Sequence, residues 1–230
     1  MNELNFESEL IKYITSGTIT VSEDDFQKSN IRETAKDYVV KTKLWQYRVD
    51  IKTTAQLWAN FKQILEQHNQ NTLDKPLSTV EFNQVKKIIS DLKTPYDAGQ
   101  FLYGLNGVSQ IEIDLDDGRH VFLTVFDQKQ IGAGNTVYQV VNQIERPALL
   151  IGKQERRFDT TLLINGLPII QIEEKRDSHD VNEALNQMHQ YILENQYTDI
   201  FSTLQILVAI TPNNVKYMAK TTADKINKDI

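Results

Sequence analysis

Apolar residues in the first half of the chain recur at the spacing of amphipathic helices. This spacing predicts four helices, over residues 5–16, 31–46, 54–68 and 79–93. β-Branched residues weaken the second of these four predictions. In the third helix, Phe61 and Leu65 fall on one face, and Ser78 or Thr79 is placed to cap the fourth. We therefore expect residues 1–104 to be mainly helical.

Beyond Gly104 the pattern changes to the alternation typical of β-strands. Two strands are predicted around the turn sequence Asp116-Asp117-Gly118, and two more around Asn165-Gly166, the strongest short hairpin signal. The predicted strands cover residues 108–115, 119–126, 136–144, 160–164, 169–173 and 204–210, and the last is apolar enough to be buried on both faces. With a helix that begins in a predicted capping box at residues 180–183 and runs to about residue 194, they predict an α/β (α+β) core over residues 105–220.

A cluster of charges flanks the second predicted hairpin. An apolar run leads into Glu173-Glu174-Lys175, and Asp159 precedes the first strand of the same hairpin. Side chains alternate along a strand, so Glu173 and Lys175 are expected to share one face while Glu174 points to the other. The simplest register for a two-residue turn would place Asp159 on the face opposite Glu173. A bulge is therefore required, and we expect it at Pro168, which cannot donate to the ladder.

Two carboxylates and one ammonium group suit the metal-dependent hydrolysis of a phosphodiester. Asp159 and Glu173 would hold Mg²⁺, which prefers oxygen ligands and keeps several waters. The metal would lower the pKa of a bound water, and Lys175 would position that water and stabilise the developing negative charge. On the following helix, Gln187 is a candidate to contact a DNA phosphate or a metal-bound water, and Tyr191, four residues on, to orient it. The competing interpretation is ordinary surface charge.

Composition changes this picture in several ways. The formal net charge of −6 argues against a protein that holds nucleic acid alone, and it calls for a local basic patch or a partner that supplies DNA affinity. The absence of cysteine excludes disulfides and thiolate metal sites and fits a cytoplasmic location. No export signal is visible and no apolar run approaches the ~20 residues that span a bilayer, so no membrane partner is expected.

The aromatic residues at helical spacing could form a platform on which bases stack, but we expect them to pack in the core. They are Trp45, Trp58, Phe61 and Phe82.

Several of these motifs together resemble one family. They are Phe158-Asp159, Leu163-Ile164-Asn165-Gly166-Leu167-Pro168, Glu173-x-Lys175 and Asn186-Gln187-Met188-His189-Gln190-Tyr191. In combination they resemble the N-terminal nuclease domain of the R (motor) subunit of type I restriction-modification enzymes. The resemblance covers residues 140–220 well and residues 1–100 only loosely.

The resemblance implies a PD-(D/E)xK nuclease fold, in which a mixed central sheet is flanked by helices, and Mg²⁺-dependent cleavage of double-stranded DNA. It implies that Asp159 and Glu173 bind the metal and that Lys175 is catalytic. Gln187 and Tyr191 match the Q-x-x-x-Y element that the family shares with RecB-like nucleases. One departure is Glu174, which fills a position where the family usually has an apolar residue.

The family also implies partners beyond this chain. Its R subunits carry an ATP-powered, helicase-like DNA translocase after the nuclease domain and act with methyltransferase and specificity subunits. No G-x-x-x-x-G-K-[ST] motif occurs here, so ATP is expected to serve the full-length subunit and not to bind these residues. We expect one nuclease domain over residues 1–230, with residues 221–230 beginning the linker to the translocase. The alternatives are a stand-alone RecB-like DNA nuclease and a non-catalytic domain that docks the motor.

Overall fold

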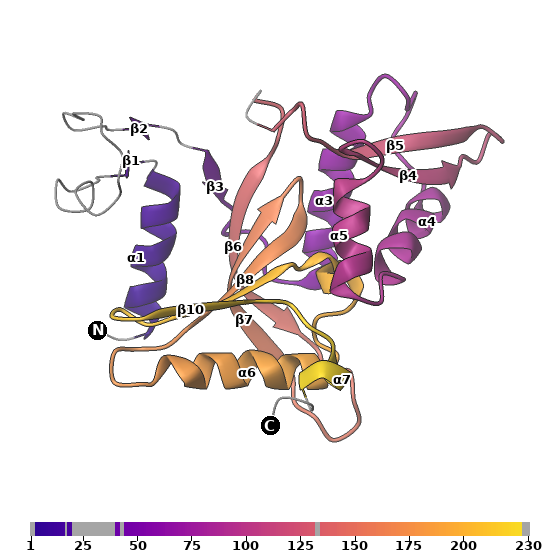
Figure 1. The fold of residues 1–230 in the computed structure, drawn as a ribbon. Helices are drawn as coiled ribbons and strands as arrows, with labels where there is room; N and C mark the ends of the chain where they lie inside the picture. Colours follow the sequence, from indigo (N-terminus) through magenta and orange to yellow (C-terminus); the bar gives the residue numbers. More distant parts are fainter. Residues whose placement is uncertain (1–2, 17, 20–39, 42–43, 132–133, 227–230) are drawn as a thin grey trace.

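The computed structural model describes residues 3–16, 18–19, 40–41, 44–131 and 134–226. Within them, six strands form a mixed sheet whose order is β10 (Val215–Ala219), β9 (Ile206–Ile210), β8 (Leu167–Glu174), β7 (Arg156–Ile164), β6 (Tyr138–Arg146) and β3 (Trp45–Tyr47). The pairs β3–β6 and β8–β9 are parallel, and the other neighbours are antiparallel. Helices flank this sheet, so the predicted α/β fold is confirmed (Figure 1).

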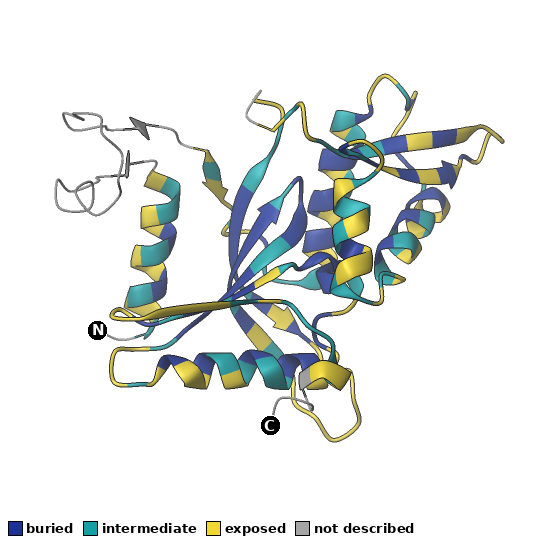
Figure 2. Ribbon diagram, in the orientation of Figure 1, coloured by how far each residue is buried: buried dark blue, intermediate teal, exposed yellow. Residues whose placement is uncertain are grey.

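Helices cover the sheet on both sides, and the two layers differ in size. Helix α1 (Glu3–Ser16) places Ile11 in a small apolar cluster with Leu162 and Ile172 of the central strands. The main core lies on the other side, where α3 (Thr54–His68), α6 (Val181–Leu193) and the 3₁₀ helix η1 (Asp199–Thr203) pack against the sheet. Burial is concentrated in the central strands and on the inner side of α3 (Figure 2).

Capping residues explain where the helices in the first half of the chain begin. Thr53 and Ser78 form capping boxes with Gln56 and Glu81, and these boxes start α3 and α4 (Thr79–Ser90). Both helices lie where the sequence predicts them, with Ser78 as the cap. A third capping box starts α5 (Pro95–Tyr103), which the apolar pattern does not predict because Ala98 is its only buried residue.

The helix predicted over residues 31–46 is wrong in the part that the structure describes. Residues 31–39 and 42–43 lie outside the described residues, whereas Val40–Lys41 and Trp45–Tyr47 are the strands β2 and β3. Strand β2 pairs with β1 (Thr18–Ile19), and β3 runs parallel to β6 with Trp45 packed edge-on against Tyr138. Long-range pairing and aromatic contact therefore outweigh a weak helical pattern in this segment.

The remaining β-structure follows the prediction with smaller corrections. The hairpin β4 (Val108–Asp114) and β5 (His120–Asp127) forms around the predicted turn. Strand β9 is fully buried on one face only, because Ile206 is 39% exposed on the other. Strand β10 and the short helix α7 (Ala223–Ile226) lack a strong apolar pattern and are not predicted. No helix among the described residues is long and apolar enough to cross a membrane.

Candidate active site

The hairpin of β7 and β8 brings the three predicted catalytic residues together. Its turn holds Asn165 and Gly166 at φ 49° and 82°, the left-handed conformations that a tight two-residue hairpin requires. The ladder pairs Leu163 with Pro168 but Leu162 with Ile170, so one residue of β8 is unpaired directly after Pro168. The predicted bulge is therefore confirmed, and the register that follows from it places Asp159 opposite Glu173.

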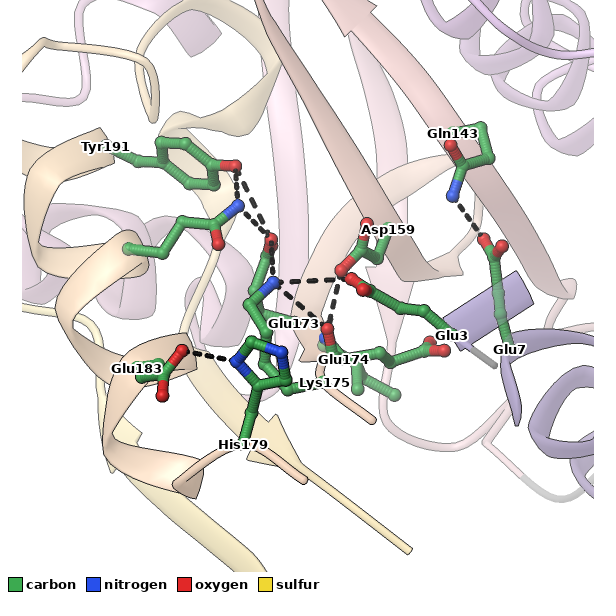
Figure 3. A network of polar contacts seen from close by, with 12 residues as sticks. Glu3, Glu7, Gln143, Asp159, Glu173, Glu174, Lys175, His179, Glu183 and Tyr191 are labelled. Atoms are coloured by element: carbon green, nitrogen blue, oxygen red, sulfur yellow. Dashed lines mark hydrogen bonds and ion pairs between the residues drawn. The ribbon is translucent and has the colours of Figure 1, made fainter. Parts of the chain in front are cut away.

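Asp159 is fixed by the backbone of the opposite strand. The ladder of main-chain pairs ends at Thr160 and Ile172, and beyond it the Asp159 Oδ2 atom accepts a hydrogen bond of 2.9 Å from the Glu174 amide (Figure 3). Burial raises the pKa of Asp159, although the Glu174 amide and the Lys175 ammonium group oppose that rise. The carboxylate is therefore held beside the Glu-x-Lys segment before any ligand binds.

Glu173 is one of two fully buried charged groups at the site. Its side chain is fully buried, and its Oε1 atom accepts hydrogen bonds from Gln187 Nε2 at 2.5 Å and from Tyr191 Oη at 3.4 Å. Its Oε2 atom has no hydrogen-bond partner among the described residues. Burial, and then the nearby Asp159 carboxylate, raise the pKa of Glu173 well above its usual value. A cation between the two carboxylates would remove this repulsion.

Lys175 completes the cluster from the end of β8. Its Nζ atom donates to the Glu174 carbonyl oxygen at 3.1 Å and lies 3.9 Å from Glu173 Oε1. The same ammonium group donates to Glu3 Oε1 of α1 at 3.4 Å (Figure 3). Lys175 and Glu173 thus share one face, as the alternation of the strand predicts.

Glu174 lies on the other face, toward α1. Its carboxylate is fully buried and neither oxygen has a hydrogen-bond partner among the described residues. Burial raises the pKa of Glu174 to about 8, and the nearby Thr160 hydroxyl opposes this rise without reaching the geometry of a hydrogen bond. This orientation agrees with the prediction that Glu173, and not Glu174, faces Asp159.

Helix α6 supplies the two residues of the Q-x-x-x-Y element. Gln187 Nε2 lies 2.5 Å from Tyr191 Oη, so the expected pairing along the helix is present. Both side chains contact Glu173, and Tyr191 is buried, which raises the pKa of its hydroxyl. Their direct partner in the structure is therefore the Glu173 carboxylate. The predicted capping box of α6 is only half formed, because Asp180 caps the helix but Glu183 bonds to His179 at 2.6 Å.

The sequence gives no sign that α1 belongs to this site. Glu3 and Lys175 are 172 positions apart, and no local pattern relates them. Glu7, one turn further along α1, is buried and accepts hydrogen bonds from Asn142 at 2.9 Å and Gln143 at 2.8 Å. Glu7 stands three and four residues before Leu10 and Ile11, so helical spacing places it on the apolar face of α1, but only the packing of α1 on the sheet reveals what that face meets.

The donor set fits a hard divalent cation. In the part of the chain that the structure describes, no group of three or more histidine, aspartate or glutamate side chains is arranged around one metal position. Asp159 and Glu173 are the adjacent pair of carboxylates, and Glu173 Oε2 is buried with no other partner. Mg²⁺ suits such a pair, because it takes few carboxylates and keeps waters in its remaining positions.

The aromatic residues of the first half of the chain pack in the core. Trp58, Phe61 and Phe82 are buried and pack on one another with ring centroids 6.1–6.5 Å apart. Trp45 is half-buried against Tyr138. The core interpretation of these residues is confirmed.

Comparison with known proteins identifies related chains. The model of the family described as type I restriction enzyme R protein N terminus matches residues 22–226. The endonuclease subunit of a type I restriction enzyme from Staphylococcus aureus is 30% identical over 178 residues, which are 77% of this chain and 18% of the relative. The corresponding subunit from Staphylococcus saprophyticus is 30% identical over 172 residues, 74% of this chain and 17% of the relative. The EcoprrI endonuclease subunit of Escherichia coli is 38% identical over 109 residues, 46% of this chain and 33% of the relative.

Proposed function

Because the chain belongs to the family of type I restriction enzyme R protein N termini, we propose that it is the module that cleaves double-stranded DNA in such an enzyme. The observation that carries the proposal is the convergence of Asp159, Glu173 and Lys175 at one end of the hairpin β7–β8. Nothing in the packing of the hairpin requires a half-buried and a fully buried carboxylate side by side, since burial raises the pKa of both. A site that binds a cation explains their presence.

In this proposal each residue has a separate task. Asp159 and Glu173 hold Mg²⁺, which when bound lowers the pKa of a water and offsets charge on the scissile phosphate. Lys175 orients the attacking water and stabilises the negative charge that develops on the phosphate oxygens. Gln187 and Tyr191 fix Glu173 Oε1 by hydrogen bonds, which leaves Oε2 to face the metal.

The rest of the enzyme is expected to supply what this chain does not contain. The chain spans about a fifth of the length of the staphylococcal relatives that it matches. We propose that the remainder of the full-length subunit carries the ATP-dependent translocase and that methyltransferase and specificity subunits complete the complex. These partners would provide much of the DNA affinity that a net charge of −6 does not.

The test is cleavage of supercoiled plasmid by the full-length subunit with its partner subunits, Mg²⁺ and ATP. Glu173→Gln and Lys175→Ala are expected to lose nicking and linearisation while ATP hydrolysis continues. Lys93→Ala, which removes a cation that is 74% exposed between α4 and α5, is the matched control and should cut as the wild type does. If both site variants still cut, the cluster is not the nuclease site and the domain is a docking module.

A second readout separates metal binding from activity. Mg²⁺ is expected to raise the melting temperature of the wild-type chain, because a ligand that binds only the native state stabilises it. The same shift should be absent in Glu173→Gln, which removes one anionic ligand but keeps the shape of the side chain. An equal shift in both proteins would rule out Glu173 as a metal ligand.

A further inference from the structure

Arg157 lies on β7 two residues before Asp159. Phe158 between them is fully buried, whereas Arg157 is exposed and Asp159 is half-buried. Side chains two apart on a strand share a face, and the rise of ~3.3 Å per residue separates them by roughly 7 Å. Arg157 and Asp159 therefore lie on one face of β7, and the strand fixes the backbone of both.

Arg157 differs from the two arginines near it because its side chain has no partner among the described residues. Arg156 donates to Glu194 through Nε at 2.7 Å and Nη2 at 2.6 Å. Arg146 is buried and donates to the Gln196 carbonyl oxygen at 2.9 Å. Arg157 forms no ion pair with any residue that the structure describes. Its five donors are thus available to a ligand.

The three arginines line one groove. Its volume is about 810 Å³, and its other walls include Thr53 and Thr54 at the beginning of the fifteen-residue helix α3. The positive end of a helix dipole favours an anion there. Two carboxylates, Glu145 and Glu155, also line the groove. Arg156 is paired with Glu194 and Arg146 lies 3.7 Å from Asp199, so Arg157 is the arginine of the groove that forms no ion pair among the described residues.

We propose that Arg157 and this groove bind a phosphate of the DNA backbone next to the phosphate that is cleaved. The proposal rests on the proposed function, because it places DNA across the Asp159–Glu173 site. Arginine suits this task because its planar fork can bind two phosphate oxygens at once. A local contact of this kind explains how an acidic chain can hold DNA in register while other parts of the enzyme supply affinity.

The experiment measures binding of a short DNA duplex to the full-length subunit in chelator, so that no cleavage occurs, between 50 and 200 mM salt. Arg157→Ala is expected to weaken binding about fivefold at low salt, as the loss of one exposed phosphate contact should. The slope of log K against log salt should fall in magnitude by about one. Arg157→Lys should keep the slope because it keeps the charge.

Two controls distinguish phosphate binding from a structural role. Glu145→Gln removes the cross-strand neighbour of Arg157 and should bind DNA at least as well as the wild type. Lys93→Ala removes a remote exposed cation and should leave the slope unchanged. If Arg157→Ala binds with an unchanged slope, or if Glu145→Gln weakens binding equally, the proposed contact is wrong.

Plasmid cleavage with partners, Mg²⁺ and ATP separates this inference from the proposed function. If the wild type cuts and Arg157→Ala binds DNA as tightly as the wild type, the nuclease assignment is supported and the phosphate contact is refuted. If the wild type does not cut but Arg157→Ala still binds DNA more weakly and with a smaller salt slope, the phosphate contact is supported and the nuclease assignment is refuted.

Discussion

The pair formed by Arg156 and Glu194 joins the beginning of β7 to the end of α6. Glu194 is 1% exposed and accepts two hydrogen bonds from Arg156, at 2.7 and 2.6 Å, and a third from Gln190 at 2.9 Å. The Arg156 guanidinium also lies 5.7 Å from the centre of the Tyr191 ring. Replacing Arg156 by alanine would leave a buried carboxylate whose nearest remaining cation is Lys153, at 3.9 Å.

The expected loss follows from this geometry. Removal of one partner of a fully buried ion pair costs about 3–5 kcal/mol of unfolding free energy, because the other charge is left without compensation. Here the Arg156 side chain is 26% exposed, so water reaches part of the pair. Lys153 and Gln190 also retain some stabilisation of Glu194. We therefore expect Arg156→Ala to lose about 2 kcal/mol at pH 7.

The loss should depend on pH in a defined direction. Arg156 lowers the pKa of Glu194 below its ordinary value of 4.5. A carboxyl group whose pKa is lower in the folded state stabilises the protein above its unfolded pKa, and this contribution disappears as the pH falls through the folded value. The difference between wild type and Arg156→Ala should thus be constant above about pH 5.5 and shrink below pH 4.5.

Urea unfolding of this chain at several pH values provides the measurement. Arg156→Lys should lose less than Arg156→Ala, since it keeps the charge but not the bidentate geometry. Arg157→Ala is the matched control, because it removes the neighbouring arginine that has no partner, and it should change the unfolding free energy by less than about 0.5 kcal/mol. An Arg156→Ala loss below 0.5 kcal/mol, or one that is the same at pH 4 and pH 7, would refute the reasoning.

Two further predictions concern the turn and the helix that frame the site. Gly166→Ala should destabilise the chain by about 2 kcal/mol in urea unfolding, because the residue has φ 82° and a Cβ atom would lie 2.9 Å from the Phe61 Cα atom; an unchanged midpoint would contradict this. Tyr191→Phe should slow plasmid cleavage about tenfold yet change the unfolding free energy by less than about 1 kcal/mol, because it removes a hydroxyl from Glu173 while Gln187 still donates to that carboxylate. A wild-type cleavage rate would show that the hydroxyl does not position Glu173.

Local chemistry in the sequence determined much of the hairpin that carries the site. Asn165-Gly166 specified a two-residue turn, and Pro168 specified where the ladder is interrupted, so the unpaired residue of β8 and the facing of Asp159 and Glu173 followed from residues within one hairpin. Alternation along β8 separated Glu173 from Glu174 for the same reason. The start of α3 and α4 was likewise predictable, because a capping box is a contact between residues three apart.

Other features were decided by tertiary structure alone. The parallel pairing of β3 with β6, the contact of Glu3 with Lys175 and that of Glu7 with Asn142 join segments separated by about 90 to 170 positions, across which no periodic pattern extends. Helix α5 and strand β10 bury few apolar side chains, so neither leaves a stripe in the sequence. A further example is that Arg156 is paired whereas the neighbouring Arg157 is not. This difference arises only when the beginning of β7 packs against Glu194 at the end of α6. Short-range geometry is encoded by neighbouring residues, whereas the partner of a charge is set only when distant elements pack.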